Sequence, residues 1–138
     1  MLDHDAIASL LPHSGSMVLL DSVESWTEAA IVCRTGSHRA AGNPLRQNSR
    51  LSGLCGIEYG AQAMAVHGAL ISGSNRRPGL LAALRNVSCH VAYLDNIGDD
   101  LTVRARLLIG EHERFIYTFS IQCADADLLA GEAVVVLR

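Results

Sequence analysis

Apolar residues occupy almost every position from 51 to 71, so a helix over this segment would be hydrophobic on all of its faces. Such a helix is normally buried in a folded protein or in a membrane. Ser52 is a suitable N-cap, and Ser72 with Gly73 marks the end of the segment. The length approaches the roughly 20 residues of a membrane span. However, the segment contains four glycines, a glutamate, a glutamine and a histidine. The pattern therefore predicts a long core helix in a globular protein and no membrane span.

The second half of the chain alternates apolar and polar positions with the period of a β-strand. Turn-forming residues at 110–114 and 124–127 interrupt this alternation. In the first of the alternating strands, the positions expected on one face are Leu101, Val103, Ala105, Leu107 and Ile109. With the mostly apolar stretch that precedes it, the pattern predicts strands at residues 80–91, 101–109, 115–123 and 128–137.

The first half of the chain predicts fewer elements. A short helix at 6–11 ends at Pro12, and two strands follow at 17–23 and 29–35. Residues 36–50 are polar and rich in turn formers, which indicates a loop. Two strands, one long helix and then a run of antiparallel strands predict an α+β fold in which a sheet wraps around the helix. We expect residues 1–138 to form a single domain.

Composition narrows the class of protein. Hydrophobic residues make up 49% of the chain and charged residues 18%, which is typical of a globular domain rather than a disordered one. The net charge of −3, without a basic cluster, argues against nucleic-acid binding.

The cysteines and histidines do not suggest a metal site. The four cysteines lack CxxC spacing, and the six histidines lack the spacing of metal ligands. The N-terminus does not resemble a signal peptide, and no glycine-rich phosphate loop is present. We therefore expect free thiols, a cytoplasmic location, no metal and no other cofactor.

Glu58 is the only carboxylate of the apolar helix segment. Burying a carboxylate is costly unless it is paired or hydrogen-bonded, so its presence suggests a functional role. Gln62 lies one helical turn further on and is placed to form a hydrogen bond with it. A carboxyl group in such apolar surroundings would suit a general acid.

Several motifs resemble a known family when they are taken together in chain order. They are Leu11-Pro12-His13, the run from Met17 to Val23 that contains Asp21, Glu58-Tyr-Gly-Ala-Gln62, Asn86-Val87, and Gly98-Asp99 followed by Leu101. This series is similar to the β-hydroxyacyl-ACP dehydratases of fatty-acid synthesis. Gly56-Ile-Glu-Tyr59 and Ala61-Gln-Ala-Met64 further resemble a divergent bacterial subgroup, the predicted hotdog dehydratases of aryl-polyene-type clusters.

The resemblance implies a hotdog fold, in which a curved antiparallel sheet wraps a central helix, usually as a dimer with its active sites at the subunit interface. It implies removal of water from a 3-hydroxyacyl thioester that is carried by acyl carrier protein or CoA. By position in the motif, Glu58 falls on the helix carboxylate that handles the leaving hydroxyl, and Gln62 falls on the following glutamine. Gly53 falls on the glycine whose N–H stabilises the oxyanion. The partner is expected to be a second copy or a related hotdog subunit.

One departure from the family pattern affects the expected chemistry. The family's catalytic histidine falls on Pro44, within Gly42-Asn43-Pro44-Leu45. His38, in the same loop, is a candidate for a substitute base, and Asn43 is a candidate to hydrogen-bond the substrate carbonyl but cannot accept a proton at neutral pH. His13 matches a family histidine that is usually structural.

Three functions remain open from the sequence. The first is a 3-hydroxyacyl-ACP dehydratase, or one subunit of a two-component dehydratase whose other subunit supplies the base. The second is a thioesterase that uses Glu58 to activate water, and the third is a non-catalytic acyl-binding subunit. For the first, we expect an acyl tunnel along the helix, lined by Ala61, Met64, Ala65, Leu84 and Val87.

Overall fold

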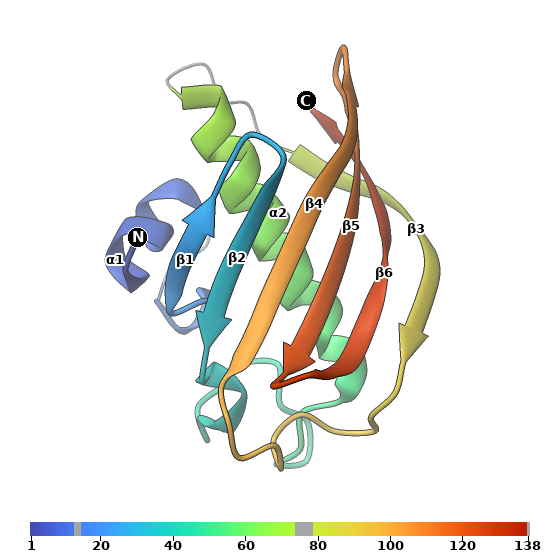
Figure 1. Ribbon diagram of the computed structural model, residues 1–138. Coiled ribbons are helices and arrows are strands. Elements are labelled where there is room, and N and C mark those ends of the chain that lie inside the picture. The colour runs from blue at the N-terminus through green and yellow to red at the C-terminus, as the bar shows by residue number, and fades with distance from the viewer. Residues whose placement is uncertain (13–14, 74–78, 138) are drawn as a thin grey trace.

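A curved sheet of six antiparallel strands surrounds one long helix in the computed structural model of the chain (Figure 1). The structure describes residues 1–12, 15–73 and 79–137. The strand order is β1-β2-β4-β5-β6-β3. The strands are β1 (Ser22–Trp26), β2 (Ala30–Thr35), β3 (Gly79–Cys89), β4 (Leu101–Glu111), β5 (Arg114–Cys123) and β6 (Ala126–Leu137). This arrangement is the predicted α+β architecture.

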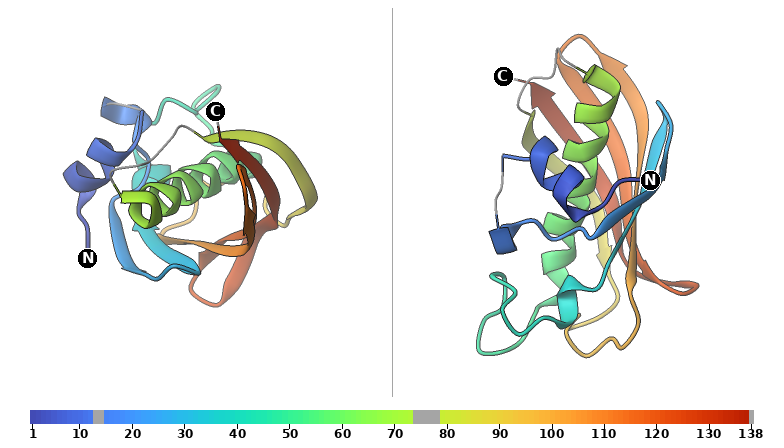
Figure 2. Two further views of the ribbon diagram at one scale, coloured as in Figure 1. Left: turned by 90° about the horizontal axis from the view of Figure 1, so that it is seen from above. Right: turned by 90° about the vertical axis from the view of Figure 1, so that its left-hand side faces the viewer.

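The long helix is α2 (Gly56–Ser72), and it crosses the concave face of the sheet (Figure 2). Its start differs from the prediction, because Ser52 caps a preceding 3-10 turn, η3 (Gly53–Cys55), by accepting a hydrogen bond from the Leu54 N–H. Its end agrees with the prediction. Gly73 forms the C-cap with a φ of 59°, a conformation that favours glycine.

Close approach of the sheet explains two glycines of α2. A Cβ added to Gly60 would lie 2.5 Å from the Phe119 ring, and one added to Gly56 would lie 3.1 Å from Ile121. Both neighbours belong to β5, which passes directly across the helix. Glycine at these positions therefore allows helix and sheet to pack closely.

The predicted alternation in β4 holds until the strand is distorted. Leu101, Val103 and Ala105 are buried on the concave side, as expected. A register shift against β5 then falls between Leu107 and Ile109, and Ile109 is half exposed. Leu108 is the extra residue of β4 at this shift, and it turns the side chains that follow to the opposite face.

The predicted strand at 17–23 is wrong over most of its length, because β1 begins only at Ser22. Met17 ends a 3-10 turn, η1 (Gly15–Met17), and Leu19 lies in extended chain outside the sheet. Side chains satisfy this backbone in place of a neighbouring strand. The Leu19 N–H donates to the Gln62 side chain, and the Leu19 carbonyl accepts from Thr35. Residues 17–20 therefore form a mostly buried segment outside the sheet, which we call the strap. Its apolar composition reflects burial rather than sheet pairing.

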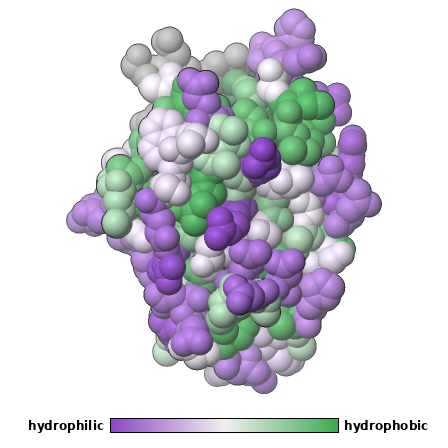
Figure 3. Space-filling view, viewed as in Figure 1, coloured by the Kyte–Doolittle hydropathy of each residue, from purple (hydrophilic) through white to green (hydrophobic). Residues whose placement is uncertain are grey.

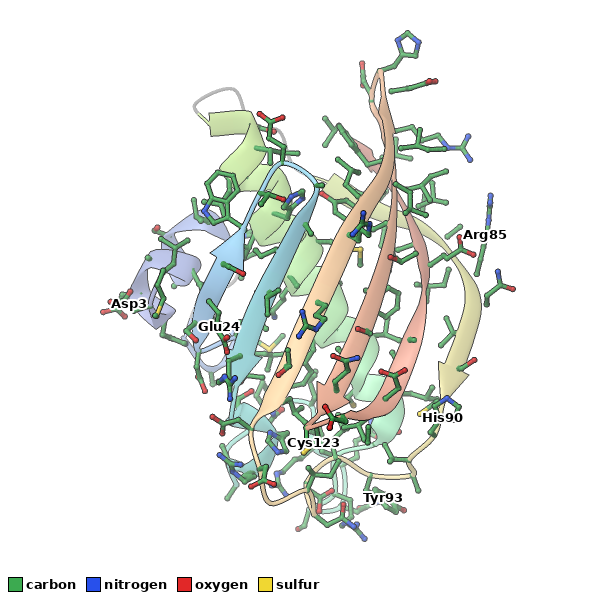
Figure 4. All side chains as sticks on the ribbon, viewed as in Figure 1. Asp3, Glu24, Arg85, His90, Tyr93 and Cys123 are labelled. Atoms are coloured by element: carbon green, nitrogen blue, oxygen red, sulfur yellow. The ribbon has the colours of Figure 1, made fainter. Side chains whose placement is uncertain are left out.

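Helix α1 (His4–Leu10) lies beside α2 and β1, with Asp3 as its N-cap. Asp3 accepts a hydrogen bond from the Ala6 N–H, and in Figure 4 it marks the outer end of this helix. The observed helix agrees with the predicted one to within two residues at its start. Because α1 packs against α2, it reaches the region described below as the candidate site.

The two faces of the sheet differ in polarity. The convex face is largely hydrophilic, with a hydrophobic area towards the β4–β5 hairpin (Figure 3). Strand β3 forms one edge of the sheet and is exposed along almost its whole length. None of the helices in the described residues has the length and apolarity that crossing a membrane requires.

Candidate active site

A cavity of about 570 Å³ runs along α2 on the side that faces α1 and the ends of β3, β5 and β6. This volume is in the range of small-molecule binding pockets. Most of its wall is aliphatic or aromatic. The helix contributes Glu58, Ala61, Gln62, Met64, Ala65, Gly68, Ala69, Ile71 and Ser72; the other walls are Leu10, Leu11, Pro12, Gly79, Leu81, Phe115, Tyr117, Val135 and Leu137.

Glu58 supplies the carboxylate of this cavity, close to the N-terminus of α2. It is half-buried rather than enclosed, so it faces the cavity from a helix that is otherwise mostly buried. The Gln62 Nε2 donates to its Oε1 over 3.4 Å, which confirms the expected contact between residues one turn apart. A carboxyl group in an apolar cavity at the positive end of a helix is a suitable acid or base for a bound ligand.

Gln62 is held rigidly by the strap that precedes β1. Its Oε1 accepts from the Leu19 N–H at 2.9 Å, and its Nε2 donates to the Met17 carbonyl at 2.7 Å. The backbone donor and acceptor fix which end of the amide is oxygen and which is nitrogen. Gln62 therefore always presents an N–H, and never an oxygen, to Glu58, so it is a positioning residue for the carboxylate.

A buried histidine of α2, His67, holds Tyr117 of β5 in the cavity wall. The His67 Nε2 lies 2.8 Å from the Thr27 carbonyl, so that nitrogen carries the proton. His67 Nδ1 is then an acceptor, and the Tyr117 hydroxyl, at 2.8 Å, donates to it. Burial raises the pKa of Tyr117 to about 12, which keeps the phenol neutral. His67 does not line the cavity itself, but it holds Tyr117 in the cavity wall.

Gly53 does not offer a free N–H in this structure. Its N–H donates to the Ala92 carbonyl at 2.8 Å. An added Cβ would lie 2.1 Å from the Val91 carbonyl oxygen, so the connection between β3 and β4 passes directly over this glycine. The need for glycine at this position is therefore explained by packing, and Gly53 is not among the residues that line the cavity.

The loop that contains Asn43 is held by a buried polar cluster. The Asn43 Nδ2 donates to the Ser37 carbonyl and to the Tyr59 hydroxyl, each at 3.0 Å. Its Oδ1 accepts from the Leu45 N–H, and the Ser37 Oγ lies 2.8 Å from the Tyr59 hydroxyl. The Asn43 amide is thus occupied by the protein, and neither Asn43 nor Tyr59 lines the cavity.

His38 lies in the same loop and is fully buried. Its Nε2 lies 3.0 Å from the Ile97 carbonyl, so Nδ1 is unprotonated, and Nδ1 has no hydrogen-bond partner among the described residues. Burial lowers the pKa of this imidazole. The structure places His38 away from the cavity wall, and no histidine of the described residues lines the cavity.

The structure thus brings five of the predicted residues together and places five others outside the cavity wall. Glu58 and Gln62 share the cavity with Ala61, Met64 and Ala65, whereas Gly53, His38 and Asn43 lie outside its wall. Leu84 and Val87, also predicted to line it, do not, since β3 contributes Gly79 and Leu81 instead. His13 falls outside the described residues. Within the described residues, no three metal-binding side chains gather at one place.

Several wall residues were not predicted from the sequence. Gly68 follows Ala65 by three positions, and the helical spacing of the small residues was a usable signal for it. The contribution of Leu11, the C-cap of α1, and of Phe115 and Tyr117 in β5, depends on contacts between distant segments. No local pattern indicates those contacts.

We expect the free energy of unfolding to fall as the pH is lowered from about 7 to 5. Burial lowers the pKa of both His38 and His67 below the ordinary value of 6.5. The unfolded chain therefore binds more protons than the folded one in the window below pH 6.5, and folding loses stability there. Urea unfolding at pH 7.5, 6.0 and 5.0 measures this loss.

The matched variant for this measurement is His67→Gln, which cannot titrate. It should be less stable than the parent at pH 7.5 but should show a shallower decline with pH. An equally steep decline in His67→Gln would show that His67 does not contribute to the pH dependence.

Comparison with known proteins supplies the family context. A family model described as ApeP-like, the ApeP dehydratase, matches residues 5–137. A search of curated proteins finds no match.

Solved structures share the fold. A chain of the dehydratase heterocomplex ApeI:P from Xenorhabdus doucetiae has a TM-score of 0.83 at 24% identity, over 100% of this chain and 92% of that one. Zebra fish thioesterase superfamily member 2 has a TM-score of 0.67 at 16% identity, over 100% of both chains. A variant of a thioesterase from Staphylococcus aureus has a TM-score of 0.63 at 14% identity, over 85% of this chain and 92% of that one. These likenesses confirm the hotdog fold.

Proposed function

We propose a function from one premise: the chain belongs to the ApeP-like dehydratase family. It is a single hotdog domain of the cytoplasm that contributes Glu58 and an acyl-binding cavity to a 3-hydroxyacyl-thioester dehydratase. A related hotdog subunit contributes the catalytic base. The observation that carries the proposal is a carboxylate at one end of an apolar cavity whose described wall contains no histidine.

In the proposed reaction, a base from the partner removes a proton from Cα of the 3-hydroxyacyl thioester. Glu58, in its protonated form, donates its proton to the departing hydroxyl at Cβ. The C–O bond breaks, the electrons of the former C–H bond form the Cα–Cβ double bond, and water leaves. Glu58 ends as a carboxylate and the base ends protonated, so transfer of that proton back to Glu58 through solvent restores the site.

The cavity supports a substrate with a long apolar chain. Ala61 and Ala65 follow Glu58 along one side of α2 and leave the groove beside the helix open. Burying each methylene of an acyl chain contributes about 0.8 kcal/mol. The thioester is expected to lie near Glu58, with its carrier, acyl carrier protein or CoA, outside the cavity.

The exposed edge of the sheet supports assembly with a second hotdog chain. Leu80, Leu81 and Leu84 of β3 are 49%, 39% and 38% exposed. An edge strand with exposed apolar side chains can pair with a strand of another chain. Figure 4 shows Arg85 extending outwards from this edge. Because ApeI:P is a heterocomplex, a related subunit is the proposed partner in preference to a second copy.

Product analysis tests the proposed reaction. The complex of this chain with a related hotdog subunit is given 3-hydroxybutyryl and 3-hydroxydodecanoyl pantetheine thioesters. The absorbance of the enoyl thioester and the release of free thiol are followed together. We expect enoyl thioester to form without thiol. Release of thiol without enoyl product would instead identify a thioesterase that uses Glu58 to activate water. Binding of the acyl thioester without either product would identify a non-catalytic acyl-binding subunit.

A further inference from the structure

The cavity extends well beyond the carboxylate. Glu58 and Ser72, which both line it, are 14 residues apart on the helix, or about 21 Å along its axis. Gly68 lies between them, ten residues from Glu58, or about 15 Å along the axis. A ligand whose reacting end is at Glu58 passes Gly68 only if its chain is long.

Gly68 differs in its surroundings from Gly56 and Gly60, the other glycines of α2. A Cβ at Gly60 would lie within 2.5 Å of Phe119, but a Cβ at Gly68 would meet nothing within 4 Å. Packing against the protein therefore does not require glycine at position 68. Glycine in the middle of a helix weakens the helix relative to alanine. Because Gly68 has no side chain, the cavity stays open beside it.

Tyr117, one residue of the cavity wall, is held in a fixed position. His67, the residue before Gly68, accepts the hydrogen bond of the Tyr117 hydroxyl at 2.8 Å. It also donates to the Thr27 carbonyl at 2.8 Å, so Tyr117 is tied through the helix to the turn between β1 and β2. A side chain introduced at position 68 would therefore narrow the cavity instead of displacing Tyr117.

We infer that the glycine at position 68 keeps the cavity open to long acyl chains, which a larger residue at this position would exclude. The inference rests on the proposed function, since it takes the acyl chain to start at Glu58. An extended chain advances about 1.25 Å per carbon, from a C–C bond of about 1.5 Å at the tetrahedral angle. The interval of about 15 Å between Glu58 and Gly68 then corresponds to about 12 carbons. Chains shorter than this end before position 68, and longer chains pass it.

The test measures turnover by the complex for 3-hydroxyacyl pantetheine thioesters of 4, 8, 12 and 16 carbons. For Gly68→Leu we expect kcat/KM to fall at least tenfold for the 16-carbon substrate and less than twofold for the 4-carbon one. Gly68→Ala should give a smaller change of the same kind. Gly98→Leu is the matched control, because Gly98 is exposed, lies outside this cavity, and a Cβ there also meets nothing within 4 Å.

Leucine has a higher helix propensity than glycine, so Gly68→Leu should unfold at a temperature at least as high as the parent. An equal loss for all four chain lengths, or no change for any of them, overturns the inference while leaving the proposed function intact.

A binding experiment separates the two proposals. Calorimetry with saturated butanoyl and hexadecanoyl pantetheine reports occupation of the cavity without dehydration, because these ligands have no 3-hydroxyl group. If the parent complex dehydrates nothing but Gly68→Leu still weakens hexadecanoyl binding at least tenfold, the proposed reaction fails and the role of Gly68 stands. If the parent binds neither ligand, both proposals fail.

Discussion

Replacing Glu58 by glutamine is expected to lower kcat for dehydration by about two to four orders of magnitude, the usual contribution of a positioned general acid or base. Glutamine has nearly the same size as glutamate and keeps an oxygen that can accept the Gln62 N–H, which lies 3.4 Å from Glu58 Oε1. It has no acidic proton for the leaving hydroxyl. Steady-state kinetics on a 3-hydroxyacyl thioester measure the effect.

The control for this substitution is Glu28→Gln, which makes the same chemical change at an exposed position in the turn before β2. It should leave kcat within twofold of the parent. The binding of a saturated acyl thioester should be nearly the same in Glu58→Gln and the parent, because the apolar wall is unchanged. A fall in kcat of less than tenfold in Glu58→Gln would show that Glu58 is not the acid.

Replacing Gly53 by alanine is expected to reduce the free energy of unfolding by about 3 kcal/mol or more, at the upper end of the cost of overpacking. The new methyl group would lie 2.1 Å from the Val91 carbonyl oxygen. That oxygen is backbone, so a rotamer change cannot relieve the clash. Either the 3-10 turn before α2 or the connection between β3 and β4 must move, and the hydrogen bond from the Gly53 N–H to the Ala92 carbonyl is strained or lost.

The free energies of unfolding of Gly53→Ala and Gly98→Ala, measured in urea, are compared with that of the parent. A Cβ at Gly98 meets no atom within 4 Å, so that variant should unfold within about 0.5 kcal/mol of the parent, as is usual for surface changes. If Gly53→Ala were as stable as the parent and lost only activity, Gly53 would have a catalytic role rather than the packing role that we assign to it.

The elements with a strong local pattern were predicted well from the sequence. The uniformly apolar segment predicted the central helix, and Glu58 and Gln62 meet because residues four apart lie on one face of a helix. The apolar strap at 17–20 was the main error. Its backbone is satisfied by the side chains of Gln62 and Thr35, which are distant in sequence, so composition alone did not distinguish it from a strand.

The candidate site was predicted only in part, and the reasons are physical. On its helical side, Ala61, Met64 and Ala65 were expected to line a tunnel along the helix, and the structure has them in the cavity wall. By contrast, the partners of Gly53 and His38 are backbone carbonyls that lie more than 35 residues further along the chain. Such contacts depend on how the connection between β3 and β4 folds back, and a single sequence does not show this.

The structure also clarifies the departure from the family motif at Pro44. Asn43, beside it, is fixed to Ser37 and Tyr59 by its amide nitrogen. Tyr59 itself is fully buried in α2, next to Glu58 in sequence. The loop is therefore held in one conformation by neutral hydrogen bonds, an arrangement that suits a scaffold more than a base.

The central claim is that this chain supplies the acid and the acyl cavity, and that a related subunit supplies the base. The most direct test measures enoyl-thioester formation by this chain alone, by a related hotdog subunit with a loop histidine alone, and by the two together. We predict no activity for this chain alone, and activity of the mixture that is lost when Glu58 is replaced by glutamine. Full activity of this chain alone, or unchanged activity of the mixture containing Glu58→Gln, would contradict the claim.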